Sequence, residues 1–201
     1  MLFCCRANSE LIKKRGKELF DSVTNSDDPE NQIWALEFIR CHPTAFGKAP
    51  EDTLRYVVGL LYHEQTRLAT CAFDASGALL SHYHMQVRDH SFDVLMSAFH
   101  LLTSHAAPVR EKALHLTVLL LGLEPMSASR ELLYLVRKSE RLQVLGTMVA
   151  FRRAICRSKG VQDMPLADIY NLYAAYVEES DDDLLKTEGM LGLDVMKFYF
   201  R

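Results

Sequence analysis

Apolar residues recur at three- and four-residue intervals along most of the chain, and this period predicts a succession of amphipathic helices. The clearest stripe lies within 91–102, where Ser91 is a candidate helix cap. Pro108 opens a second segment, 109–123, which is apolar nearly all round and is expected to be the most buried helix. Further helices are expected over 8–22, 33–39, 50–61, 127–142 and 165–178.

Residues 67–87 depart from this period. Two runs, 67–73 and 78–87, flank Asp74-Ala75-Ser76-Gly77, in which the glycine can supply the positive φ of a tight turn. This pattern predicts a β-hairpin. Residues 142–155 suit either a helix or one or two strands, because Val144, Thr147 and Val149 favour strands, and we favour the helix.

These elements together predict a helix-rich α+β fold in which the hairpin at about 67–87 packs with several helices around one core. The length suits one sizeable core, so a single globular domain over 1–201 is expected. A flexible basic segment at about 1–8 and an acidic region at about 178–188 are expected within it. An acidic turn precedes a closing segment at 195–200.

The composition is that of a globular protein. Of 201 residues, 49% are apolar and 24% charged, which excludes disorder and low complexity. The longest nearly apolar stretch, 113–123, is shorter than the about 20 residues of a membrane span. Residues 1–6 lack the apolar run and cleavage site of a signal peptide. We therefore expect no secretion signal, no transmembrane helix and a cytoplasmic location.

The net charge of −3 conceals an uneven distribution. Residues 6–17 carry five basic side chains against one acidic, and residues 130–159 carry eight against two. Beyond residue 160 the sign reverses, with nine acidic side chains against three basic. The chain is therefore electrically polar along its length, which suggests separate contact surfaces.

The N-terminal segment combines two cysteines with basic charge. Two acyl chains, or one chain together with basic residues, are what stable membrane anchoring requires. An unmodified, solvated helix face explains the same residues without a membrane. The predicted membrane-contact residues are Cys4, Cys5, Arg6, Lys13, Lys14, Arg15 and Lys17.

The central basic stretch can bind phosphate, because arginine is a forked donor and each neutralised phosphate releases counterions. The predicted contacts to a nucleoprotein or phosphate are Arg137, Lys138, Arg141, Arg152, Arg153 and Arg157. The alternative is that these residues form ion pairs with the acidic residues at 178–183 within the chain. Those acids can instead join neighbouring subunits head to tail, and the predicted self-association residues are Glu178, Glu179, Asp181, Asp182 and Asp183.

Catalytic and metal chemistry have weaker support. In the expected hairpin, His82, His84 and Cys71 would share one strand face and could hold Zn²⁺, although no fourth ligand is placed. Cys71 beside a histidine could also act as a nucleophile. The five cysteines include no Cys-x-x-Cys pair, and no phosphate loop or nucleophile elbow is present. We predict no catalytic residues, no bound metal and no cofactor.

Three segments resemble the matrix proteins of rhabdoviruses, a family of negative-strand RNA viruses. They are His84-Met85-Gln86-Val87-Arg88 as a strand, 91–99 as the first core helix, and 110–123 as the following helix. The resemblance covers about a third of the chain. It implies a small structural protein that lies beneath a viral envelope, associates with itself and condenses the ribonucleoprotein.

The function expected from these observations is therefore binding without chemistry. The chain would be a viral matrix-like assembly protein that bridges the inner face of an anionic membrane and a nucleoprotein or RNA, and that forms oligomers. Its location would be the cytoplasmic side of host membranes and the virion. Two alternatives stay open: an RNA-binding accessory protein that sequesters double-stranded RNA by shape, and a cytosolic helical adaptor.

Overall fold

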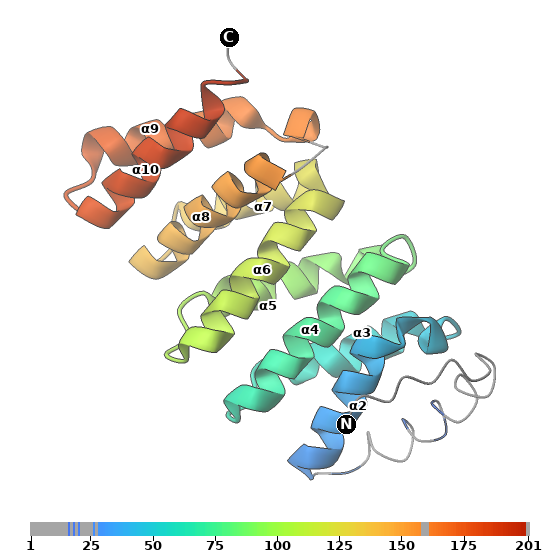
Figure 1. Cartoon of the computed structure of the whole chain (residues 1–201). Helices are drawn as coiled ribbons and strands as arrows, with labels where there is room; N and C mark the ends of the chain where they lie inside the picture. The colour runs from blue at the N-terminus through green and yellow to red at the C-terminus, as the bar shows by residue number, and fades with distance from the viewer. Residues whose placement is uncertain are drawn as a thin grey trace. The chain divides into compact units, whose positions relative to one another are not determined.

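The computed structural model describes residues 16, 18, 20, 26, 28–157 and 161–199. Throughout these residues the regular elements are helices, and no strand is formed. Contacts divide the chain into two compact units, Met1–Ser91 and Phe92–Arg201, and each is described by itself. Figure 1 shows the helices of both units in chain order. The expected single domain over 1–201 stays a prediction.

The first unit is a small helical layer structure. It contains α2 (Pro29–Cys41), η1 (Pro43–Phe46), α3 (Pro50–Gly59), α4 (Thr66–Tyr83) and η2 (Arg88–His90). Both α2 and α3 pack against α4, and Leu36, Leu54 and Leu79 are fully buried among them. The Asp28 carboxylate caps α2 by accepting a hydrogen bond from the backbone N–H of Glu30 at 3.1 Å.

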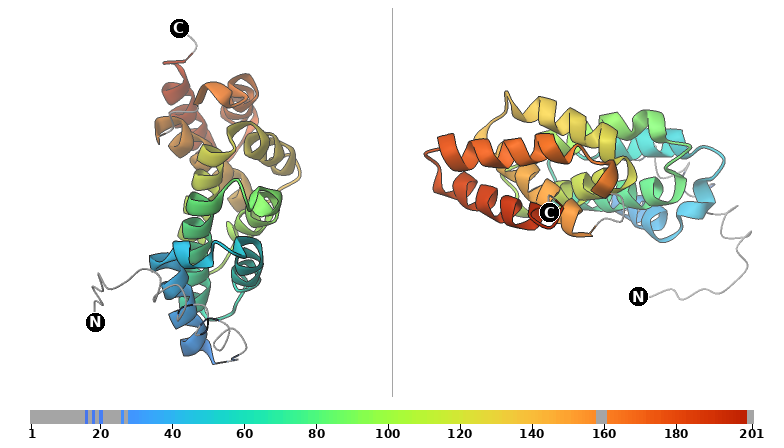
Figure 2. Two further views of the ribbon diagram at one scale, coloured as in Figure 1. Left: turned by 90° about the vertical axis from the view of Figure 1, so that its right-hand side faces the viewer. Right: turned by 90° about the horizontal axis from the view of Figure 1, so that it is seen from above.

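The second unit stacks helices in two layers. Its elements are α5 (Ser91–Leu101, which starts at the boundary), α6 (Ala107–Leu123), α7 (Pro125–Val136), α8 (Arg141–Arg157), η3 (Val161–Asp163), α9 (Leu166–Glu179) and α10 (Asp183–Met196). In one layer α6 packs on α8 and α8 on α10; in the other, α7 packs on α9. Helices α9 and α10 lie side by side in both views of Figure 2. Phe151 of α8 and Tyr173 of α9 are the largest fully buried side chains here.

The predicted β-hairpin at 67–87 is wrong, and the α+β fold class falls with it, because α4 occupies 66–83 and a turn follows at 84–86. The physical reason lies in the composition: no β-branched residue occurs between Cys71 and Gln86, whereas alanine and leucine, strong helix formers, are frequent. Gly77 is tolerated inside the helix at a cost of about 1 kcal/mol. The strand expected at 84–88 is also absent: residues 84–86 form a turn, and Arg88 begins η2.

Most of the expected helices are confirmed. The apolar segment 109–123 lies within α6, and 142–155 lies within α8 even though its valines and threonine favour strands. Val144 and Thr147 are buried there, so tertiary packing outweighs their local preference. The helix expected over 127–142 ends earlier, at Val136, and a turn separates it from α8. Helix α10 was not predicted.

Candidate functional site

Two arginine–carboxylate pairs join α8 to α10. Arg141 donates from Nη2 to Asp182 Oδ1 at 3.0 Å and from Nε to Oδ2 of the same carboxylate. Arg152 donates from Nε to Glu188 Oε1 at 2.5 Å and from Nη2 to Oε2 at 3.0 Å. Both pairs have the two-pronged geometry that makes such contacts specific. The predicted alternative, ion pairs between the basic stretch and the acidic residues at 178–183, is therefore confirmed at Arg141. Arg152 is also paired within the chain, but with Glu188, which lies outside that range.

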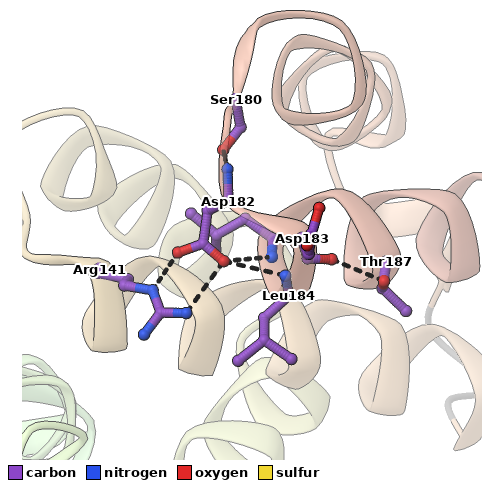
Figure 3. Close-up of polar contacts among 7 residues, drawn as sticks. Arg141, Ser180, Asp182, Asp183, Leu184 and Thr187 are labelled. Atoms are coloured by element: carbon purple, nitrogen blue, oxygen red, sulfur yellow. Dashed lines mark hydrogen bonds and ion pairs between the residues drawn. The ribbon is translucent and has the colours of Figure 1, made fainter.

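Asp182 is also the N-cap of α10 (Figure 3). Its Oδ1 accepts hydrogen bonds from the backbone N–H groups of Leu184 at 2.9 Å and Leu185 at 3.3 Å. The Arg141 hydrogen bond is the main cause that lowers the pKa of Asp182 from 3.8 to about 2, against a smaller opposing effect of burial. Asp182 thus holds α10 in place and is already engaged inside the chain.

The other predicted phosphate contacts are divided between two places. Arg137 and Lys138 lie in the turn between α7 and α8, near the start of α8. Arg153 and Arg157 lie four residues apart near the end of α8, about 18 Å or more further along the helix at 1.5 Å per residue. The structure therefore brings no single surface together from the six basic residues.

The predicted membrane-contact residues lie outside the described residues. This applies to Cys4, Cys5, Arg6, Lys13, Lys14, Arg15 and Lys17, and to the flexible segment expected at 1–8. Their role stays a prediction. No helix in the described part of the chain is both long and apolar enough to cross a membrane.

The predicted self-association residues surround the start of α10. Glu178 and Glu179 end α9, Asp181 lies in the connecting turn and Asp183 begins α10, and all four are exposed. Asp182, between them, is engaged as described. The free carboxylates of this acidic turn are therefore available at the surface beside α10.

An exposed apolar stripe continues from that turn along α10. Leu184 is 55% exposed, Met190 51% and Leu191 45%. Residues seven apart lie on the same side of a helix, so Leu184 and Leu191 form one row. We call these three residues, with Asp183 and Asp194, the α10 outer face. Sequence reasoning missed it because it placed no helix over 183–196; the Asp182 cap before Leu184-Leu185 was the available signal.

The opposite side of α10 is tightly packed. A Cβ added at Gly192 would lie 2.4 Å from the Tyr173 ring, and one at Gly189 would lie 2.8 Å from Val177. Glycine at both positions therefore lets α9 and α10 approach closely. The buried Tyr173 hydroxyl donates to the Met148 carbonyl at 2.7 Å, which ties α9 to α8. This packing gives the outer face a firm support.

The cysteine and histidine candidates do not come together. Cys71 and His82 lie on one helix, α4, about 16 Å apart along its axis, so they cannot share an ion. Within the described ranges, no group of three His, Cys, Asp or Glu side chains could hold a metal ion. Burial, with a smaller contribution from the nearby Glu37, raises the pKa of the Cys71 thiol, which disfavours the nucleophilic thiolate.

Comparison with known proteins gives the fold alone. No family model matches the chain, and no curated protein matches it. An engineered protein whose crystal structure comes from the Northeast Structural Genomics Consortium is similar, with a TM-score of 0.54 and 18% identity over 96% of this chain and 87% of that chain. A second engineered protein from the same consortium has a TM-score of 0.39 and 15% identity over 96% and 93% of the two chains.

Proposed function

We propose that this protein is a non-enzymatic adaptor that binds another protein through the α10 outer face. The observation that carries the proposal is the row of exposed apolar side chains on α10, between 45% and 55% exposed, on a helix whose other side is firmly packed. Contiguous apolar patches rimmed by polar residues commonly mark protein-binding surfaces. Stacked helices present such faces on a rigid support, which reduces the entropy lost on binding.

The ion pairs between α8 and α10 also support a protein partner. Two arginines expected to meet phosphate, Arg141 and Arg152, are held by carboxylates of the chain itself. A phosphate at either arginine would have to displace a two-pronged carboxylate contact. This favours a protein partner over a nucleic acid at this end of the unit.

Affinity capture by the full-length chain, followed by quantitative mass spectrometry, tests the proposal. The informative variant is Leu184→Ser with Leu191→Ser, and the matched control is Met126→Ser with Tyr134→Ser, which changes two exposed apolar residues of α7. We expect a set of proteins recovered with the wild type and the control and lost with the α10 variant. Equal recovery with all three chains would contradict the proposal.

The second candidate is the bridge between membrane and nucleoprotein expected from the sequence, including its viral matrix-like form. The observation that favours it is the pair Arg153 and Arg157, one helical turn apart on α8 and outside the two ion pairs that join α8 to α10. Reversal of both to Glu should reduce RNA binding and its salt dependence. RNA affinity equal to that of the wild type would reject this candidate.

A further inference from the structure

We propose that the partner presents a basic amphipathic helix to the α10 outer face; this inference rests on the proposed adaptor function. The partner helix would place leucine-like side chains against Leu184 and Leu191. Its lysines or arginines would lie toward the acidic turn, Glu178 to Asp183. This is recognition of one helix by another, in which apolar anchors repeat at three-, four- and seven-residue intervals.

The apolar spacing on α10 fits a helix. Leu184 and Leu191 are separated by two helical turns, about 10 Å along the axis. Met190 widens the row, and Val195, half-buried, continues it. A partner helix can lay its own row alongside this one, as in coiled-coil packing.

The charge of this surface determines which charge we expect on the partner. Between residues 178 and 197, all of which the structure describes, Asp182 and Glu188 are neutralised by arginines of α8. The carboxylates outside those pairs are Glu178, Glu179, Asp181, Asp183 and Asp194, against the two lysines Lys186 and Lys197. Lys197 contacts Asp194 at 2.5 Å with both side chains about two-thirds exposed, so this pair is weak. The surface is therefore net negative, and a basic helix complements it.

The same charge disfavours the other occupants. A second copy packed on the same face would place one net-negative surface against another, and like charges across an interface are costly. An anionic membrane would repel the carboxylates that flank Leu184. Of these three occupants, a basic amphipathic helix alone can both cover the leucines and pair with the carboxylates.

The test is a titration of the full-length protein with two synthetic helical peptides of about 18 residues, long enough for five turns. Both peptides carry leucine at the same three-, four- and seven-residue intervals; one has lysine and arginine at its remaining positions and the other has glutamate. We expect the basic peptide to bind at least about tenfold more tightly at low salt, with the ratio shrinking as salt screens the charges. Equal affinity for the two peptides would overturn the proposal.

A charge variant tests which residues are responsible. Asp181→Asn with Asp183→Asn removes two charges of the acidic turn and keeps side-chain size. We expect about tenfold weaker binding of the basic peptide at low salt, from two partly screened charge contacts. The matched control, Asp163→Asn with Asp168→Asn, removes two exposed carboxylates near the other end of α9 and should leave the affinity unchanged. An equal loss in both variants would overturn the assignment to the acidic turn.

Two further measurements test the other two occupants, a second copy of the chain and a membrane. If sedimentation shows a dimer and Leu191→Ser abolishes it, the occupant is a second copy and the basic-helix proposal is wrong. Flotation on phosphatidylcholine–phosphatidylserine vesicles that is abolished by the same change would replace the basic helix by a membrane. If the basic peptide fails to bind while the capture experiment still recovers partners through Leu184 and Leu191, the inference falls and the adaptor function stands.

Discussion

The two faces of α10 are built from similar residues and differ in exposure. Leu184 and Leu185 are neighbours in sequence, yet the first is 55% exposed and the second 6%. The inner face meets Tyr173 so closely that Gly192 has no room for a side chain. The outer face keeps its leucines in solvent. Residue type alone therefore does not tell a core position from an exposed one; the direction of the side chain on the helix does.

This contrast predicts that stability depends on the inner face of α10 and partner binding on its outer face. Inner-face changes should lower the free energy of unfolding, because they disturb close packing between α9 and α10. Outer-face changes should leave stability nearly unchanged and reduce partner binding.

Tyr173→Ala should have the largest effect. It removes a fully buried ring together with the hydrogen bond to the Met148 carbonyl. We expect a loss of about 3–5 kcal/mol in the free energy of unfolding, measured by urea denaturation. Tyr134→Ala, on α7 and 62% exposed, is the control and should cost less than about 1 kcal/mol. Equal losses would show that α9 is not packed as described.

Gly192→Ala should come next. The new methyl group would meet the Tyr173 ring, and we expect overpacking to cost about 1–3 kcal/mol in the same assay. Gly122→Ala is the matched control, since nothing lies within 4 Å of a Cβ built there in α6. That change should stabilise the chain slightly, by up to about 1 kcal/mol, because alanine favours the helix. A stable Gly192→Ala protein would contradict the close approach of α9 and α10.

Glu188→Gln should cost about 1–2 kcal/mol, because it leaves the Arg152 charge partly buried without its carboxylate. The cost stays below that of a fully buried pair since the Arg152 side chain is 28% exposed. Chemical denaturation measures the loss. Replacement of both partners, with Arg152→Met and Glu188→Leu, should recover part of it; no recovery would indicate that the pair itself is not responsible.

The lowered pKa of Asp182 predicts that the stability of the protein depends on pH in the acidic range. Its folded pKa, about 2, lies below the unfolded value of 3.8, because Arg141 stabilises the carboxylate. The unfolded chain therefore takes up the proton first as the pH falls. The stability that Asp182 contributes is complete above pH 3.8 and is lost as the pH falls through about 2. The unfolding midpoints of wild type and Asp182→Asn should therefore converge from pH 5 to pH 2. A constant difference would contradict this assignment.

Leu191→Ser should change stability least. Its side chain is 45% exposed on the outer face, so the free energy of unfolding should stay within about 0.5 kcal/mol of the wild type. Thermal unfolding measures this. A loss above about 2 kcal/mol would show that Leu191 belongs to the core, and the distinction between the two faces of α10 would be wrong.

The sequence predicted the long periodic helices better than the remaining elements. α6 was recognisable because Pro108 opens a long apolar run. α4 was mistaken for a hairpin because Asp74-Ala75-Ser76-Gly77 is also a turn-like sequence. In the structure these four residues lie inside a continuous helix. α10 was missed because its acidic start was interpreted as a turn, whereas Asp182 is a helix cap.

The candidate site was only partly predictable. Opposite charges in the sequence suggested the contact between the basic stretch and residues 178–183, and Arg141 with Asp182 forms it. Which acid would be engaged and which would stay free depended on the capping geometry at the start of α10. The outer face required knowledge of which of the two neighbouring leucines, Leu184 and Leu185, points inward, and the structure buries Leu185.

The most direct test of the account is the affinity of the basic peptide for Leu191→Ser, compared with wild type and with Tyr134→Ser, in samples whose unfolding midpoints have been measured. We predict at least about tenfold weaker binding to Leu191→Ser with an unchanged midpoint, and wild-type affinity for Tyr134→Ser. Wild-type affinity for a folded Leu191→Ser protein would contradict the claim that the outer face of α10 is a binding surface.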